Sequence, residues 1–500
     1  MAAANLIEDL YSARPADGAL FIKPDGQVVN TAKALSHIAA LSAGLRAEGV
    51  VAGDRVSVKL PKSVEGILLA HAVLHAGGIL HPLNDTYTDS EIAALLADAE
   101  PAVMVCDPAE ADRLGPLAAR AGATLRTYAP GGGTIRPVRD APATASLPAG
   151  HDGAALLYTS GTTGKPKGAL ITHRNLIGSA RSLAGVWDLG PRDVLLHALP
   201  IYHAHGLLTS INTLLAAGGA IRLLDRFDPR AVLTALSRTT LMMGVPTHYA
   251  RLLAEPALAD AIGPGFRLAI SGSSALPTAL GEEFRRITGV PLLERYGSTE
   301  AAIIAAVPPD CDDRPGWVGW PLPDVEVRVH GTGGENARTG IGELETRGPH
   351  VFAGYWNNPP ATREAFTADG WFRTGDIAEI DDTGCVRILG RSRDLVITGG
   401  LNVYPAEVEN ALTSLPGVAA AAVFGVPHPD FGEAVVAAVE VSPGTSLDEK
   451  ATITALREQL AAYKTPKRIL SVEAIPRNAM GKITKPALRD AFVHLFETGA

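Results

Sequence analysis

The chain has 500 residues, of which 46% are hydrophobic and 19% are charged, and its formal net charge is -9. This length exceeds one hydrophobic core, so we expect at least two domains, and the composition excludes a disordered or fibrous protein. The acidic balance argues against nucleic-acid binding, because a phosphate backbone demands a basic face.

The cysteines, Cys106, Cys311 and Cys385, are far apart and odd in number. This spacing supports neither a disulfide framework nor a cysteine-rich metal site. The amino terminus turns acidic before any long apolar run, which is not typical of a secretory signal, and no stretch reaches the roughly 18 apolar residues of a membrane span. We therefore expect a cytoplasmic protein with neither a membrane nor a nucleic-acid partner, and a monomer is compatible with these features.

The first third of the chain alternates helical and strand-like patterns. Helical spacing is found over 31–48 and 64–75, and apolar strand-like runs cover 54–60 and 101–106. Such alternation predicts an α/β fold with a doubly wound, largely parallel sheet. Residues 131–150, rich in Gly, Pro and Ala, are expected to form a loop.

Residues 158–168, Tyr-Thr-Ser-Gly-Thr-Thr-Gly-Lys-Pro-Lys-Gly, combine four hydroxyls, three glycines and two lysines. Glycines let a backbone approach closely, and hydroxyls, N–H groups and lysines bind phosphate oxygens, so this stretch predicts a polyphosphate-binding loop. Apolar runs at 154–157 and 169–171 predict strands on either side. A P-loop is excluded because Lys165 is followed by Pro166 rather than Ser or Thr. The structural alternative is a polar surface turn.

A His-x-His pair, 203–206, lies between a predicted strand at 194–199 and a helical run at 207–215. Zinc is disfavoured, because no further Cys, His or acidic ligand stands at a characteristic spacing. Histidines that face a pocket at a strand-to-helix turn are the favoured interpretation.

Two buried strands are predicted at 241–244 and 268–271, each running directly into a polar turn, 245–251 and 272–275. In open α/β sheets, ligands bind at the carboxyl ends of the strands, so these turns and the phosphate loop should meet in one crevice. The segment 292–300 repeats the pattern. There Tyr296 suits a stacked base, Thr299 a phosphate and Glu300 a Mg²⁺ ion, although the turn alone is equally compatible with a structural role.

From residue 308 the pattern favours a small antiparallel β unit. Within it, Asp376 is suited to bind vicinal hydroxyls, the alternative being a surface Asp in a β-turn. A charged segment, 390–395, marks the predicted domain junction. The α+β segment that follows, 394–500, has a helix starting near Pro405 and strands at 418–426 and 434–441, and its basic tail includes Lys482 after a glycine.

Six motifs occur in register: 158–168, 272–274, 296–300, 374–376, 390–391 and 481–482. Together they resemble the acyl-adenylate-forming enzymes, which include acyl-CoA synthetases, luciferases and peptide-synthetase adenylation domains. Segments 203–206, 244–251 and 270–273 are more similar to malonyl-CoA synthetases than to fatty or aromatic acid ligases.

The resemblance implies a large amino-terminal domain, 1–392, built from doubly wound α/β subdomains plus a small β-barrel-like unit. A mobile α+β lid, 393–500, would turn at Arg393. It also implies two steps: a carboxylate attacks the α-phosphorus of ATP, releasing pyrophosphate, and coenzyme A then attacks the acyl adenylate, releasing AMP. ATP, Mg²⁺ and coenzyme A are the implied cofactors, and a dicarboxylic acid is the implied substrate.

Site roles are also implied by the resemblance. Catalysis is assigned to Lys482, Glu300, Thr299 and His203, and Mg²⁺ to Glu300 and Thr159. The nucleotide is assigned to Thr159, Ser160, Gly161, Thr162, Thr163, Gly164, Lys165, Gly272, Ser273, Ser274, Glu294, Arg295, Tyr296, Gly297, Asp376 and Arg391. Gly399 and Gly400 would leave room for pantetheine, and the acid would contact His203, Ala204, Arg251, Ser271 and Ser298, with Arg251 binding its distal carboxylate.

Two pocket positions depart from the malonate pattern. Ala204 stands where a hydroxyl residue is common, and Ser298 where methionine is common. Both are smaller, so we expect tolerance for methylmalonate and other C2-substituted malonates. The alternatives are a short or medium monocarboxylic acid ligase, transfer to a carrier-protein thiol, and a catalytically dead nucleotide-binding scaffold.

Overall fold

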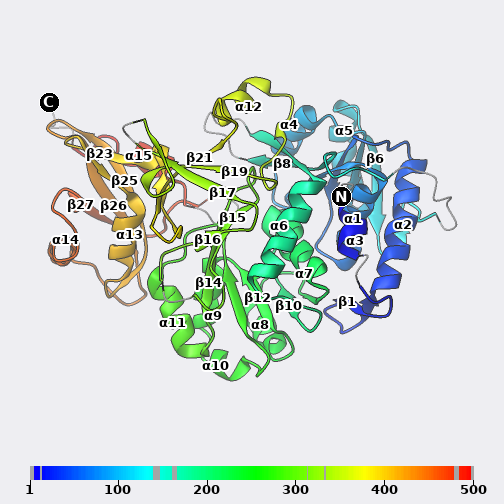
Figure 1. Cartoon of the computed structure of the whole chain (residues 1–500), viewed down its shortest axis with the longest axis horizontal. Helices are drawn as coiled ribbons and strands as arrows, with labels where there is room; N and C mark the ends of the chain where they lie inside the picture. Colours follow the sequence, from blue (N-terminus) through cyan, green and yellow to red (C-terminus); the bar gives the residue numbers. More distant parts are fainter. Residues whose placement is uncertain are drawn as a thin grey trace.

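A computed structural model describes residues 5–11, 14–138, 147–159, 166–311, 314–331, 334–477 and 483–496. The fold is mixed α/β, with a large amino-terminal region and a smaller carboxyl-terminal one at the left of Figure 1. This arrangement confirms the predicted fold class. In the described part of the chain, no helix is both long and apolar enough to cross a membrane.

An eight-stranded sheet has the order β20-β9-β8-β4-β3-β5-β6-β7, and its β8-β4-β3-β5-β6 centre is parallel. Its strands are β3 Arg55–Lys59, β4 Ile79–Pro82, β5 Val103–Cys106, β6 Thr124–Ala129, β7 Gly132–Gly133, β8 Gly153–Thr159, β9 Lys167–Thr172 and β20 Gly354–Tyr355. Its helices are α2 Thr31–Ala47, α3 Val64–Ala76, α4 Asp89–Ala99, the 3₁₀ turn η1 Pro108–Glu110 and α5 Ala111–Arg120. The helices and strands expected over 31–106 are confirmed.

A nine-stranded sheet has the order β16-β15-β14-β13-β12-β10-β11-β1-β2. Its strands are β1 Ala19–Ile22, β2 Val28–Asn30, β10 Val194–His197, β11 Ala220–Leu223, β12 Leu241–Gly244, β13 Leu268–Ser271, β14 Leu292–Gly297, β15 Ile303–Ala306 and β16 Trp320–Pro321. Its helices are α1 Leu6–Tyr11, α6 His173–Val186, the π-helix η2 Ala204–Ile211, α7 Asn212–Ala217, α8 Pro229–Leu236, α9 Pro246–Leu253, α10 Leu258–Ala261 and α11 Thr278–Thr288.

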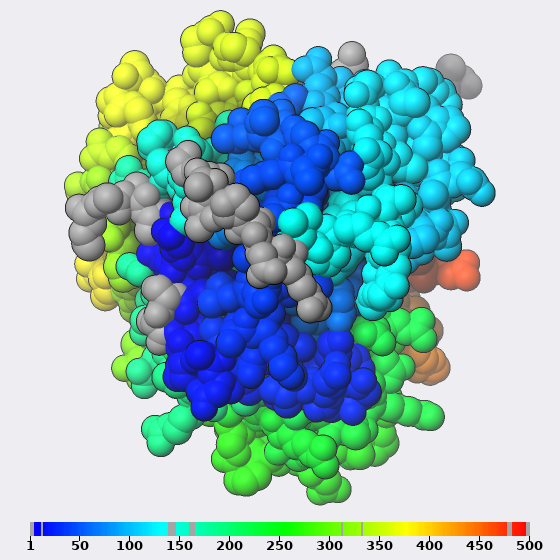
Figure 2. All heavy atoms as spheres, turned by 90° about the vertical axis from the view of Figure 1, so that its right-hand side faces the viewer, coloured from blue at the N-terminus to red at the C-terminus, as the bar shows by residue number. Residues whose placement is uncertain are grey.

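The start of the chain belongs to this second sheet, because β1 pairs in parallel with β11. Figure 2 shows the early, dark blue residues between the cyan part of the first sheet region and the green part of the second. The two large sheets therefore share one continuous hydrophobic core, which runs from α1 to β22.

The polar turn expected at 245–251 is wrong: these residues begin helix α9. Pro246 stands at its first turn, where its fixed φ favours a helix and its missing N–H costs no hydrogen bond. Gly272 to Ala275 do form a turn, as expected.

A five-stranded antiparallel sheet forms the predicted β unit, in the order β18-β17-β19-β21-β22. Its elements are β17 Glu326–His330, β18 Asn336–Ala337, β19 Gly340–Arg347, β21 Phe372–Ile380 and β22 Val386–Arg391, with α12 Pro359–Ala365 nearby. Asp376 was expected after a turn, but it lies inside β21 and is only 4% exposed. The alternative of a surface Asp in a β-turn is therefore wrong as well.

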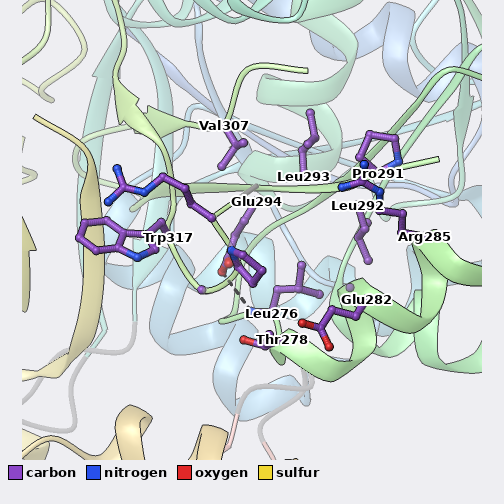
Figure 3. A pocket seen from close by; sticks show the side chains of 14 residues that line it. Leu276, Thr278, Glu282, Arg285, Pro291, Leu292, Leu293, Glu294, Val307 and Trp317 are labelled. Carbon is purple, nitrogen blue, oxygen red and sulfur yellow. Dashed lines mark hydrogen bonds between the residues drawn. The ribbon is translucent and has the colours of Figure 1, made fainter. Parts of the chain in front are cut away.

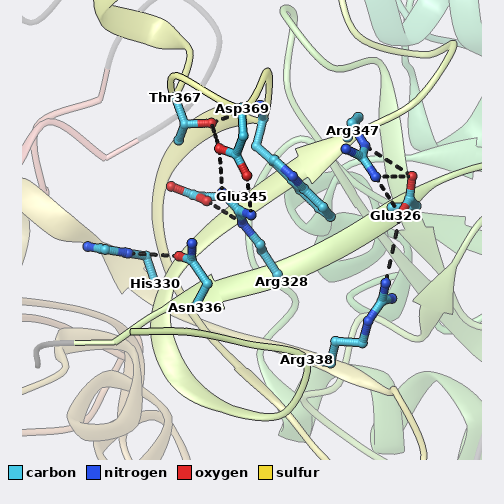
Figure 4. Close-up of polar contacts among 10 residues, drawn as sticks. Glu326, Arg328, His330, Asn336, Arg338, Glu345, Arg347, Thr367 and Asp369 are labelled. Carbon is cyan, nitrogen blue, oxygen red and sulfur yellow. Dashed lines mark hydrogen bonds and ion pairs between the residues drawn. The ribbon is translucent and has the colours of Figure 1, made fainter. Parts of the chain in front are cut away.

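One arginine joins two strands of this β unit to the turn that precedes β21. Arg328 on β17 donates from Nε to Glu345 of β19 at 2.7 Å and binds Asp369 through both terminal nitrogens. Its guanidinium lies 4.3 Å from the ring centre of Trp371. Figure 4 shows the carboxylates of Glu345 and Asp369 next to the Arg328 guanidinium. The Thr367 hydroxyl donates a hydrogen bond to Asp369.

The carboxyl-terminal region is a five-stranded sheet covered by helices. Its elements are η3 Ser392–Asp394, β23 Val396–Thr398, β24 Leu401–Val403, α13 Pro405–Thr413, β25 Val418–His428, β26 Gly432–Val441, α14 Glu449–Arg457, β27 Arg468–Val472 and α15 Lys485–Phe492. The basic tail is paired rather than simply solvated, because Lys464, Arg468 and Lys485 form ion pairs with Glu407, Glu449 and Glu409.

Candidate active site

The candidate site lies where β13 and β14 end and where η2 begins. The phosphate-loop hairpin is formed by β8 and β9, which pair antiparallel with Thr159 opposite Lys167. Residues between them, Ser160, Gly161, Thr162, Thr163, Gly164 and Lys165, lie outside the described part of the chain, as does Lys482. Their assigned roles stay predictions.

Arg295, on β14, is 7% exposed and packs against Gly272, the first residue after β13. A Cβ at position 272 would lie 2.5 Å from Nε of Arg295, so only glycine leaves room for this guanidinium. Among the described residues, neither Nε nor Nη2 of Arg295 finds a hydrogen-bond partner, although both are buried. Burial lowers the pKa of Arg295 to about 10, so the group still carries its charge at neutral pH.

His205 lies beside this arginine, in the first turn of the π-helix η2. Its Nδ1 is 3.0 Å from Oγ of Ser273, a residue held at a φ of +71°. Burial, and then the charge of Arg295, holds the pKa of His205 well below its usual range, so the ring is neutral. Its Nε2 is also buried without a partner among the described side chains. Unpaired buried polar groups cost roughly 1–3 kcal/mol each, so an arrangement that gathers them favours a ligand.

A second cationic group lies on α9. Arg251 is exposed, and its guanidinium lies 5.0 Å from the ring centre of Phe227. The His248 ring stacks on the same phenylalanine, with a centroid separation of 3.9 Å. Burial, followed by Arg251, lowers the pKa of His248 to about 4. With this pKa His248 is neutral at pH 7, so of these two side chains only Arg251 contributes positive charge.

The other predicted acid-pocket residues have varied surroundings. Half-buried His203 is the residue before η2, and its side chain makes no capping hydrogen bond. The centres of the His203 and Tyr202 rings are 4.7 Å apart. Ala204 is half-buried and packs against the main core. Ser271 is fully buried, with an Oγ that has no partner in the described structure. Ser298 accepts a hydrogen bond from the Ala301 N–H at 3.1 Å, so its hydroxyl stabilises the turn.

Three oxygen-bearing side chains meet beside the phosphate-loop hairpin. Thr159 donates to the Glu300 carboxylate at 3.3 Å, and the Tyr355 hydroxyl donates to the same oxygen at 3.1 Å. Thr299, the residue before Glu300, is half-buried. This oxygen-only donor set fits a hard cation such as Mg²⁺, which takes few protein ligands and completes its shell with phosphate and water. Among the described residues, no group of three or more His, Cys, Asp or Glu side chains is placed so that it could hold a metal ion.

A polar triad links the large sheet to the β unit. The Tyr296 hydroxyl donates to Asp376, whose other oxygen lies 2.9 Å from Nε of Arg391. Burial, and then Asp376, raises the pKa of Tyr296 well above its usual value, so the phenol stays protonated. The triad therefore presents a carboxylate whose position is fixed from both sides.

Glu294 lies one residue before Arg295, and alternation along a strand sends it to the other face. Its carboxyl accepts the Leu276 N–H at 3.0 Å, and burial raises its pKa to about 8. It lines a pocket of about 100 Å³ between β14 and α11, walled on one side by Trp317 (Figure 3). A protonated carboxyl here both donates and accepts hydrogen bonds, as the edge of a nucleobase requires.

The remaining predicted residues belong to the junction and the carboxyl-terminal sheet. Gly399 and Gly400 form the tight turn between β23 and β24, with φ values of 57° and 80°, and both are exposed. Of the residues predicted to bind the nucleotide, Gly297 ends β14 and Ser274 lies in the turn after β13, and the predicted hinge residue Arg393 lies in η3.

Sequence reasoning missed two residues of this site. His205 was part of the His-x-His pair, but its neighbour was chosen, because a π-helix shifts the side-chain phase in a way that a 3.6-residue repeat does not predict. Tyr355 carried no motif. Only the pairing of β20 with β9 brings it to Glu300.

Comparison with known proteins agrees with this geometry. The profile of the AMP-binding enzyme family matches residues 11–356, and that of the AMP-binding enzyme C-terminal domain matches residues 407–482. The chain belongs to this family, the acyl-adenylate-forming enzymes.

Among its relatives is the ATP-bound MatB of Rhodopseudomonas palustris, a solved structure with a TM-score of 0.94 and 42% identity over 99% of this chain and 100% of that one. A feruloyl-CoA synthase of Amycolatopsis is 37% identical, covering 96% of this chain and 97% of the relative. The mitochondrial malonate–CoA ligase of Homo sapiens is 35% identical over 88% of this chain and 84% of its own length.

Proposed function

We propose that this protein is an ATP-dependent acid–CoA ligase that converts malonate and C2-substituted malonates to their CoA thioesters through an acyl adenylate, releasing AMP and pyrophosphate. The relatives that act on malonate support the reaction class, and the feruloyl-CoA synthase leaves the acid to be argued from the site itself.

One observation carries the choice of a diacid: the buried guanidinium of Arg295 has two nitrogens that find no hydrogen-bond partner among the described residues. An aromatic or aliphatic acid would leave this buried charge unpaired, at a cost of several kcal/mol. A second carboxylate would accept both N–H groups in the bidentate geometry that arginine favours. Arg295 is thus our first candidate for the distal carboxylate, and exposed Arg251 the second.

In the first step, the reacting carboxylate and the α-phosphate of ATP must approach each other although both are negative. Residues 158–168 would hold the β- and γ-phosphates, and Tyr296 and Gly272 would flank the adenine while Asp376 and Arg391 hold the ribose. Thr159 and Glu300 would hold Mg²⁺, which supplies positive charge to the phosphates. Lys482 would neutralise charge that develops during the attack.

The second step needs a different arrangement of the chain. We propose domains at 1–392 and 393–500, with Arg393 as the hinge about which the smaller domain turns. That rotation would withdraw Lys482 and bring Gly399 and Gly400 to the site, where their lack of side chains leaves room for pantetheine. The thiol would then attack the acyl carbon and displace AMP.

The test is pyrophosphate release across a panel of malonate, methylmalonate, ethylmalonate, butyrate and ferulate, with coenzyme A and a carrier protein compared as acceptors. We expect the malonates to exceed butyrate and ferulate by about 100-fold in kcat/KM, which is what loss of one buried charge pair costs. Equal rates with butyrate would make the protein a monocarboxylate ligase, and a preference for ferulate would make it an aromatic acid ligase. A carrier-protein preference would reassign the acceptor.

Tolerance for C2 substituents is tested by the double variant Ala204→Thr with Ser298→Met. The added bulk should lower kcat/KM for ethylmalonate relative to malonate by about tenfold, because one extra methylene in a filled pocket changes binding by 1–3 kcal/mol. An unchanged ratio would show that these two positions do not shape the pocket around C2.

A further inference from the structure

The segment at the junction between the two regions is held by a residue far away in the sequence. Nη1 of Arg489, on α15, donates to the backbone carbonyl of Arg393 at 3.2 Å. Nη2 of the same guanidinium lies 3.4 Å from Oδ1 of Asp394, the next residue. One side chain therefore binds the peptide that follows Arg393 and the side chain that follows that peptide.

This arrangement acts on one backbone torsion in particular. The carbonyl oxygen of Arg393 belongs to the peptide plane between residues 393 and 394. Rotation about φ of Asp394 would move that oxygen relative to the side chain of Asp394 and to α15. Because Arg489 binds both, it resists rotation about φ of Asp394 and leaves the torsions of Arg393 itself unrestrained.

Helix α15 is a firm base for this contact. Leu488 and Phe492 pack in the core of the carboxyl-terminal sheet, and the Phe492 ring stacks with Phe424 at 6.1 Å. Lys485, one turn before Arg489, lies 2.6 Å from Glu409 of α13. Arg489 and Lys485 thus both anchor α15, but only Arg489 reaches the junction.

We propose that Arg489 is a positioning residue that fixes the peptide after Arg393 to the smaller domain, so that the domain rotation takes place at a single residue. This rests on the proposed two-step function, because a ligase of this kind must alternate between two defined domain orientations. Without the contact from Arg489, φ of Asp394 turns freely in addition to the torsions of Arg393, and each productive orientation becomes a smaller fraction of the population.

The first measurement is independent of activity. Spin labels are placed at exposed positions of the two regions, Glu364→Cys and Lys450→Cys, in a Cys311→Ser background whose other cysteines are buried. We expect Arg489→Gln to broaden the label-to-label distance distribution of the ligand-free protein, and Lys485→Gln to leave it unchanged. Equal distributions for wild type and Arg489→Gln would overturn the proposal.

The second measurement separates the half-reactions. Arg489→Gln should lower kcat for both acyl-adenylate formation and thiol transfer by about fivefold, roughly the net contribution of one ordinary hydrogen bond, with KM for ATP and acid unchanged. Arg489→Lys should recover part of the lost kcat, because lysine keeps the positive charge but has a single nitrogen with which to donate hydrogen bonds. Equal loss in Lys485→Gln would reduce Arg489 to a stabilising residue. If wild type releases no pyrophosphate with any acid, the proposed function fails, whereas the distance measurement still decides the role of Arg489.

Discussion

Arg295 is buried and the Arg328 side chain is only 12% exposed, yet the hydrogen-bond partners of the two guanidinium groups differ. Arg328 lies against Glu345, Asp369 and Trp371, and each of its three nitrogens finds a carboxylate. Arg295 lies against a glycine and a neutral histidine, with two nitrogens unpaired in the described structure. A charged side chain whose hydrogen-bond donors all have protein partners stabilises the fold. A buried charge with unpaired donors lowers stability, and a ligand that pairs with those donors offsets the loss.

The largest expected effect is that of Arg295→Leu on the diacid reaction. We expect kcat/KM for malonate to fall by about 100-fold or more, because the distal carboxylate would lose a buried bidentate partner. Folding stability should hold or rise, since an unpaired buried charge is removed. Steady-state kinetics and thermal unfolding measure the two quantities. A loss of stability with unchanged malonate kinetics would mean that Arg295, like Arg328, stabilises the fold and does not bind the substrate.

For Arg328→Leu we expect the opposite result, a loss of stability without a kinetic defect. It leaves the carboxylate of Glu345, whose side chain is 1% exposed, without its partner, so the free energy of unfolding should fall by about 3 kcal/mol. The double variant with Glu345→Leu should recover most of that loss, because an apolar pair replaces the charged one. Chemical denaturation measures both. Malonate kinetics below the unfolding transition should match wild type, and a specific kinetic defect would contradict the comparison.

Gly272→Ala probes the packing of Arg295 directly. The new Cβ would lie 2.5 Å from Nε of Arg295, so the guanidinium must shift. We expect about a tenfold rise in KM for malonate, with a smaller change for butyrate. The matched control is Gly265→Ala, where a Cβ meets nothing within 4 Å. Equal effects on both acids would show that the glycine serves the nucleotide rather than the diacid.

The last prediction is a pH dependence of stability at Glu294. Its pKa is about 8 in the folded protein against 4.5 when exposed, so the folded state keeps a proton that the unfolded state releases. Stability relative to Glu294→Gln should therefore fall as the pH rises from 4.5 to 8, by up to about 1.4 kcal/mol per pH unit, and level off above 8. Denaturation of both proteins from pH 6 to pH 9 tests this. If the free energy of unfolding changed with pH equally in wild type and Glu294→Gln, Glu294 would already be ionised in the folded protein.

Local pattern predicted much of this molecule. Strands at 241–244 and 268–271 form at those residues, and the strand pair around the phosphate loop and the helix start at Pro405 are both present. Strand periodicity and proline act over two to four residues, so a sequence displays them. Strand-final polar residues also indicated the edge of the sheet at which the candidate site lies.

Tertiary structure decided which charges are paired. From the sequence, Arg251 was the candidate for a distal carboxylate and Arg295 was assigned to the nucleotide, because nothing local showed that the Arg295 guanidinium has no partner in the described structure. The difference depends on Gly272 and His205, 23 and 90 positions earlier in the chain. Asp376 inside β21, Tyr355 at Glu300 and Arg489 at the carbonyl of Arg393 likewise depend on contacts between distant segments. Burial and hydrogen-bond saturation are non-local quantities, so only the folded chain determines them.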